Sequence, residues 1–292
     1  MTTTADSPIA TPDATASGQQ HRIVSGTPRS GAIGRVTVGR IVSAELIKLR
    51  TTRSMVYAML VTVLSIVGVG VMAASGLIVA GPPVDGTAGA ATVDPAGGSL
   101  TGVSLAVYVV ATLSVLAVTS EYTTGTIKST LAAVPRRTQL VIGKAIAVAA
   151  VTLTITLFST VTAFLAAKAV LSTADIPITL TAPGVLRAVV GAALYLTVVA
   201  LLSAGLGWLL RSTAGALASL VGILAVLPVV GLLLPRSIGD TVMPYLPDNA
   251  GTAIMQLTPG GQLGPWTGLA VFIGYALIAL SGAALLIRHR DA

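Results

Sequence analysis

The stretch that decides the fold is Ala214-Gly-Ala-Leu-Ala-Ser-Leu-Val-Gly-Ile-Leu-Ala-Val-Leu-Pro-Val-Val-Gly-Leu-Leu-Leu234, which holds no charged side chain. A helix rises 1.5 Å per residue and needs about 20 apolar residues to cross the roughly 30 Å hydrocarbon core of a bilayer. Five further stretches meet the same test, and we expect no charged residue well inside any apolar run. The predicted spans are residues 55–79, 100–119, 140–167, 184–210, 214–234 and 265–287.

The composition supports the same class of protein. Of the 292 residues, 54% are apolar and only 9% are charged, and the mean hydropathy is +0.91. A soluble globular domain carries about 25% charged residues, and a disordered chain is poor in apolar residues. Both classes are therefore excluded for most of the chain, and the sequence predicts an all-α membrane protein.

The basic residues are distributed unevenly about the predicted spans. The net charge of +7 would suggest a nucleic-acid partner in a soluble protein. Here 14 of the 17 Lys and Arg residues precede the first span or follow the second, fourth and sixth, and only Lys168, Arg187 and Arg236 lie on the other side. By the positive-inside rule, we expect both termini in the cytoplasm of a multi-pass protein of the cell (plasma) membrane, and no nucleic-acid partner.

The region before the first span divides into two parts. Residues 1–34 are rich in small and polar residues, which predicts a disordered cytoplasmic tail. Residues 35–54 predict an amphipathic interfacial helix, because apolar residues recur there at spacings of three and four, with Lys48 and Arg50 placed to meet lipid headgroups. Glu45 falls on the apolar face, so either it has a buried partner or it reaches outward or pairs locally with Lys48.

The segment between the second and third spans is short and basic. Ile127, Leu131 and Val134 share one helical face, so a short amphipathic helix ended by Pro135 fits there. The alternative is a solvated basic loop that obeys the positive-inside rule.

Residues in this segment resemble the corresponding loop of actinobacterial type-2 ABC transporter permeases. The resemblance rests on Glu121-Tyr122, Gly125-Thr126-Ile127, Leu131, Pro135-Arg136-Arg137 and Lys144. The run Glu45-Leu-Ile-Lys-Leu-Arg-Thr-Thr-Arg53 is similar to the entry sequence of that family. The resemblance covers the architecture from about residue 36 to the end.

The resemblance implies a membrane subunit of an exporter for a hydrophobic or amphiphilic substrate. It implies an elbow helix before the first span and a coupling helix at residues 126–134, including Lys128, that docks onto a separate ATPase subunit. Glu121 would lie at the hinge between this helix and its span, and Arg136 and Arg137 near the ATPase or lipid headgroups. A second permease, identical or different, would complete the transport path.

The sequence lacks motifs that would let this chain act alone as an enzyme. The single Gly-Lys pair, Gly143-Lys144, is followed by Ala145 and lacks the glycine loop that cradles phosphates. His21 and His289 lie outside the spans, and we expect no carboxylate within the membrane. We therefore expect no catalytic site, no metal and no cofactor on this chain, with ATP bound by the partner subunit.

Polar residues elsewhere leave two interpretations open. Thr152, Thr156 and Thr160 recur every four residues in the third span, and two glycines lie at the start of the sixth span. These residues indicate either close packing between helices or a substrate path lined by hydroxyl groups. Residues 244–257 predict a short helix at the outer interface, capped by Asp248. The rival functions are a membrane regulatory or assembly factor and a secondary carrier.

Overall fold

The structure is a bundle of long helices. The computed structural model describes residues 37–80, 95–126, 137–257 and 263–289, and every regular element within these ranges is helical. Six of the helical segments are long and apolar enough to cross a membrane, which confirms the predicted all-α, six-span fold. They are Arg53–Val79, Pro95–Thr123, Thr138–Ala174, Val185–Leu210, Thr213–Gly231 and Pro265–Ile287.

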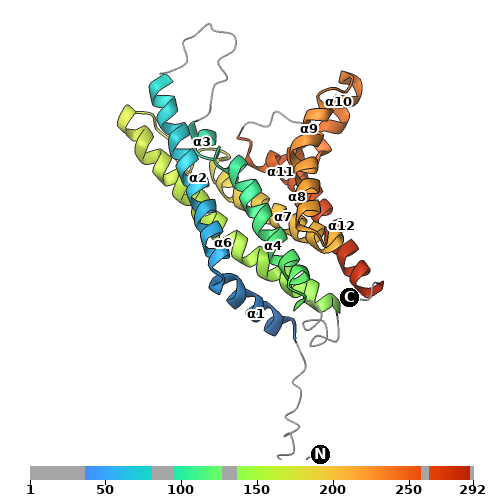
Figure 1. Cartoon of the computed structure of the whole chain (residues 1–292). Coiled ribbons are helices and arrows are strands. Elements are labelled where there is room, and N and C mark those ends of the chain that lie inside the picture. The colour runs from blue at the N-terminus through green and yellow to red at the C-terminus, as the bar shows by residue number, and fades with distance from the viewer. Residues whose placement is uncertain (1–36, 81–94, 127–136, 258–262, 290–292) are drawn as a thin grey trace, which may run out of the picture. The chain divides into compact units, whose positions relative to one another are not determined.

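Figure 1 shows the order of the helices along the chain. The longer ones are α1 (Val38–Thr51), α2 (Arg53–Ala80), α4 (Val103–Thr123), α6 (Arg137–Leu171), α7 (Val185–Leu210), α8 (Thr213–Val221) and α12 (Pro265–His289). The shorter ones are α3 (Pro95–Gly98), α9 (Leu227–Gly231), α10 (Arg236–Val242) and α11 (Pro247–Thr252). The predicted spans thus have the right number and order, with ends that differ by a few residues.

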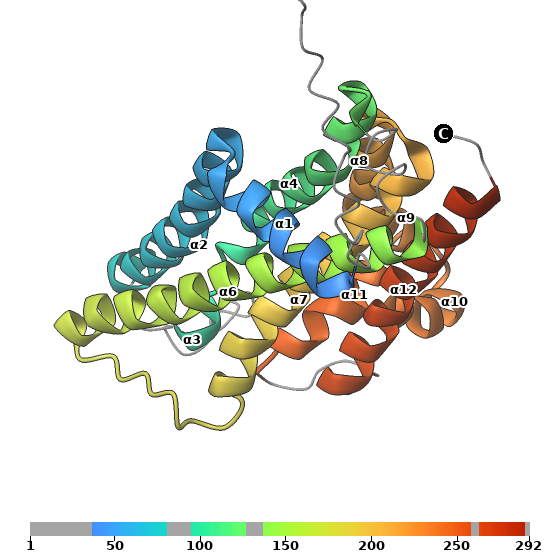
Figure 2. The same ribbon diagram turned by 90° about the horizontal axis from the view of Figure 1, so that it is seen from below.

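Helix α7 is the central helix of the bundle. It packs against α4, α6 and α12, and 72% of its most apolar stretch is buried, against 22% for α2 and 22% for the span formed by α8 and α9. Small residues allow the close contact, since a Cβ atom on Gly205 would lie 2.8 Å from the Ala279 Cβ of α12. Figure 2 shows these helices from the end at which α1 lies.

Helix α1 confirms the predicted amphipathic helix before the first span. Its Ile41 and Leu49 side chains are buried, and α1 packs chiefly along α6, as Figure 2 shows. The chain bends into α2 at Thr52, which has an extended backbone and whose hydroxyl donates to the Lys48 carbonyl at 2.7 Å. The apolar face of α1 is therefore covered largely by the protein itself.

The fifth span is not a continuous α-helix. Its middle, Gly222–Val226, is π-helical, and the Leu227 amide donates to the Gly222 carbonyl five residues back. Pro228 has no amide hydrogen, so it cannot donate to the Leu224 carbonyl as an α-helix would require. The sequence analysis missed this break, although Pro228 is a visible signal for it.

The segment before α12 forms the predicted short helix, but its details differ. Helix α11 begins after Leu246 with no side-chain cap, so the predicted capping role of Asp248 is wrong. The helix and the 3₁₀ turn Ala253–Met255 pack against α7 and α12, and Ala250 and Ile254 are fully buried. A Cβ on Gly268 would lie 2.5 Å from the Ala250 carbonyl, so this glycine serves packing.

Candidate functional site: a buried charge cluster at the end of α4

Four charged side chains from three helices meet where α4 ends. We call Glu45 and Lys48 of α1, Glu121 of α4 and Lys144 of α6 the charge cluster. The Lys144 Nζ lies 2.6 Å from the Glu121 Oε1 and 3.1 Å from the Glu45 Oε2, and the Lys48 Nζ lies 2.5 Å from the same Glu121 Oε1. Two carboxylates thus balance two ammonium groups, and the cluster joins α1, α4 and α6.

The centre of the charge cluster is shielded from solvent. Lys144 is 1% exposed and Glu121 is 3% exposed, whereas Lys48 is 47% exposed. Burying such charges costs several kcal/mol per ion unless each has partners, and Lys144 has a third one in the Ala117 carbonyl at 3.0 Å. The Glu121 Oε2 is buried and has no hydrogen-bond partner among the described residues. Removing any one charged side chain from the cluster would therefore leave a buried charge with fewer partners and would destabilise the protein.

The charge cluster resolves the alternatives left open for Glu45. Its partner is Lys144 of another helix, so the local pairing with Lys48 is wrong, and Lys48 reaches Glu121 instead. Lys144, seven residues after the start of α6, is fully buried. A signal was present in the sequence, since Glu45 lies on an apolar face and Lys144 inside an apolar run.

Aromatic contacts hold the opposite side of α4 at the same level. The Tyr122 ring meets the Trp208 ring of α7 edge to face, with centroids 5.8 Å apart, and the Arg211 guanidinium lies 5.4 Å from the Tyr122 centroid. The Thr213 hydroxyl donates to the Thr119 hydroxyl at 2.8 Å. The last turn of α4 is therefore fixed to α1 and α6 on one side and to α7 and α8 on the other.

The predicted coupling segment begins directly after this turn. Gly125 has φ +70°, a backbone conformation that favours glycine, and the Thr126 hydroxyl lies 2.9 Å from the Thr124 hydroxyl. Arg50 is exposed on α1 outside the charge cluster. Ile127, Lys128, Leu131 and Arg136 lie outside the described residues, and so does the Arg137 side chain at the start of α6.

Replacing Gly125 by Ala should lower the free energy of unfolding by about 1–2 kcal/mol, because an L-residue in the left-handed region is strained. No atom of the described residues lies within 4 Å of a Cβ at this position, so we expect the cost to come from the backbone. The thermal unfolding midpoint of the purified protein measures it. Gly76→Ala in α2, also with open space but without positive φ, is the matched control, and an equal effect in both variants would refute the backbone argument.

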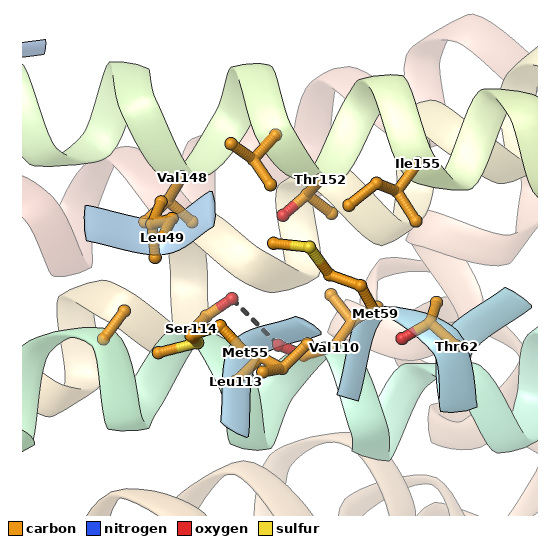
Figure 3. A pocket seen from close by; sticks show the side chains of 12 residues that line it. Leu49, Met55, Met59, Thr62, Val110, Leu113, Ser114, Val148, Thr152 and Ile155 are labelled. Carbon is orange, nitrogen blue, oxygen red and sulfur yellow. Dashed lines mark hydrogen bonds between the residues drawn. The ribbon is translucent and has the colours of Figure 1, made fainter. Parts of the chain in front are cut away.

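A small cavity adjoins the charge cluster where α1 bends into α2. Figure 3 shows Met55 and Met59 reaching between α4 and α6, with Ser114 and Thr152 on the opposite walls. The cavity has about 30 Å³, enough for one water molecule, and its lining is almost entirely apolar. Methionine side chains adapt their shape easily, so Met55 and Met59 can adjust the packing of this gap beneath α1.

The fold defines an integral, multi-pass α-helical membrane protein whose first helix is fixed to two spans by buried ion pairs. The chain belongs to the family described as "Protein of unknown function (DUF2705)", whose model matches residues 93–292. The match includes Glu121 and Lys144 and begins after α1 and α2, so Glu45 and Lys48 lie outside it. The search of curated proteins found no match.

Proposed function

We propose that this chain is the membrane-spanning permease subunit of an ABC transporter, in the cytoplasmic membrane of a bacterium. It exports a hydrophobic or amphiphilic substrate, and a separate ATPase subunit that binds ATP docks on the loop between α4 and α6. The observation that carries the proposal is the charge cluster, because it joins the residues before this loop, the residues after it and α1. The resemblance of these same residues to type-2 permeases supports it.

The cluster supplies a mechanical route from the loop into the membrane. Glu121 lies just before the loop and Lys144 two turns after its end, and both side chains are held together at 2.6 Å. Separating buried ions is costly, so a force on the loop moves α1, α4 and α6 together. Rigid-body movement of packed helices is a common way to open and close a transport path.

The orientation follows from the charges and the even number of spans. Ile41 of α1 and Ile287 of α12 belong to one hydrophobic cluster, so these helix ends lie at the same end of the bundle. Helix α4 ends and α6 begins at this same end of the bundle, and the segment that connects them is rich in Lys and Arg. We assign this end to the cytoplasm by the positive-inside rule.

A second permease, identical or different, would complete the path. The span of α8 and α9 is only 22% buried in its most apolar stretch, and large side chains such as Leu233 are widely exposed. Six spans enclose little space of their own, so the exposed faces supply both lipid contacts and a surface for a second subunit. The rival functions, a regulatory or assembly factor and a secondary carrier, require no ATPase.

Purification from the native membrane tests the proposal. We expect the tagged chain to retain an ABC ATPase subunit in mild detergent, and the reconstituted complex to transport substrate only with ATP. The loop variant Ile127→Asp/Leu131→Asp should lose the ATPase, whereas Ile238→Asp on exposed α10 should retain it. Purification without an ATPase, together with transport that is unchanged when the cell lacks one, would refute the permease function.

A further inference from the structure

A cavity of about 400 Å³ lies at the other end of α4 from the charge cluster. It is lined by the start of α4, by α7, by the π-helical segment and by α11 with its following turn, and it is open on one side. Ser104 in its wall is 17 residues from Glu121, which corresponds to roughly 25 Å along a helix. The size falls within the range of small-molecule sites, and the cavity is separate from the mechanical site described above.

Among the described residues that line this cavity, Asp248 supplies the one carboxylate. Its Oδ1 accepts a hydrogen bond from the hydroxyl of Tyr195, which is fully buried, at 2.7 Å. No Lys or Arg among the described residues forms an ion pair with Asp248. The sequence analysis placed Asp248 in this outer segment only as the cap of a short helix.

The surroundings of Asp248 favour a cationic partner. Burial raises the pKa of Asp248 above its usual value, and the hydrogen bond from Tyr195 opposes this shift. A carboxylate that has lost water gains much from a charge-assisted hydrogen bond to an ammonium group. A single carboxylate does not fit a divalent metal ion, which requires several oxygen ligands, and it repels anions.

The remaining walls suit the apolar part of a ligand. Leu100, Val107 and Leu224 are apolar, and Thr101, Ser104 and Thr252 add hydroxyl groups. Leu224 belongs to the π-helical segment. Such π-helical segments are frequent at functional sites.

We propose that this cavity binds an amphiphilic amine, with the ammonium group on the Asp248 carboxylate and the alkyl part along Val107 and Leu224. An amine site would narrow the substrate class of the transporter to amphiphilic amines. Its role in transport therefore rests on the proposed permease function. The rival explanation is structural: the bond between Tyr195 and Asp248 only fixes α11 to α7. The variant Asp248→Asn distinguishes the binding explanation from the structural one. Its amide oxygen can still accept the hydrogen bond from the Tyr195 hydroxyl, but the negative charge is absent.

Cysteine chemistry measures the charge directly, since the chain has no cysteine. The variant Ser104→Cys places one thiol in the cavity wall, where it is modified by a cationic and an anionic methanethiosulfonate reagent of similar size. We expect the cationic reagent to react faster, and Asp248→Asn to reduce the ratio of the two rates by about tenfold. Tyr195→Phe, which keeps the carboxylate, and Asp240→Asn on exposed α10 should leave the ratio high.

Protection by a ligand completes the test. Octylamine should slow the modification of Ser104→Cys, octan-1-ol should not, and the protection should disappear with Asp248→Asn. Equal rate ratios with and without Asp248, or equal protection by the alcohol, would overturn the amine site and leave Asp248 a structural residue. The assay needs no ATPase, so its failure and the failure of the permease proposal are distinguishable.

Discussion

Replacing Glu121 by Ala should lower the thermal stability of the protein and reduce substrate-stimulated ATP hydrolysis by the complex roughly fivefold or more, with membrane insertion unchanged. Among the described residues, Glu121 alone forms an ion pair with both lysines of the charge cluster, at 2.5 Å from Lys48 and 2.6 Å from Lys144. Its loss leaves Lys144 buried with Glu45 as its single charged partner, and removing one partner of a buried ion pair costs at most about 3–5 kcal/mol. Thermal unfolding and ATPase assays measure the two effects.

A double variant separates stability from coupling. Glu121→Leu/Lys144→Met replaces the buried pair by apolar side chains of similar size, which is often neutral or stabilising. We expect it to unfold at a higher temperature than Glu121→Ala but to remain uncoupled, because α1 and α4 are no longer joined. Asp240→Ala, an exposed carboxylate at the other end of the bundle, is the control. Full ATPase stimulation in the double variant would contradict the coupling role of the cluster.

Gly143→Leu should detach α1 from α6. A Cβ on Gly143 would lie 2.6 Å from the Ile41 Cγ2 and 3.0 Å from the Ile41 Cβ, so α1 must move away from α6. Overpacking of this kind costs about 1–3 kcal/mol, and the movement also draws Glu45 from Lys144. The expected result is faster amide hydrogen exchange throughout α1, together with reduced ATPase stimulation.

The control for Gly143→Leu is Gly274→Leu in α12, where no atom of the described residues lies within 4 Å of a Cβ. We expect α1 to exchange at the wild-type rate in this variant. If α1 were equally protected in both variants, the close contact at Gly143 would not be what holds the helix in place.

Local patterns were enough to predict the fold class. Each span is a run of apolar residues long enough to cross a bilayer, and this property is contained in consecutive residues. The amphipathic character of α1 is equally local, because its apolar residues follow the helical period, and Ile41 and Leu49 are buried as that period requires. The resemblance also drew attention to Glu121, which the structure places at the centre of the charge cluster.

The pairing of the charges was decided only by the tertiary structure. Lys48 and Glu121 are 73 residues apart, and Glu121 and Lys144 are 23 apart, so no local period relates them. Which carboxylate meets which lysine depends on how α1, α4 and α6 cross, and on Gly143 allowing the close contact with Ile41. The cavity around Asp248 arises in the same way, because α11 folds back against α7 and brings Asp248 to Tyr195, 53 residues earlier in the chain. The sequence by itself determined the number and order of the spans, since hydrophobicity acts along the chain, whereas the buried polar contacts followed from packing between helices far apart in it.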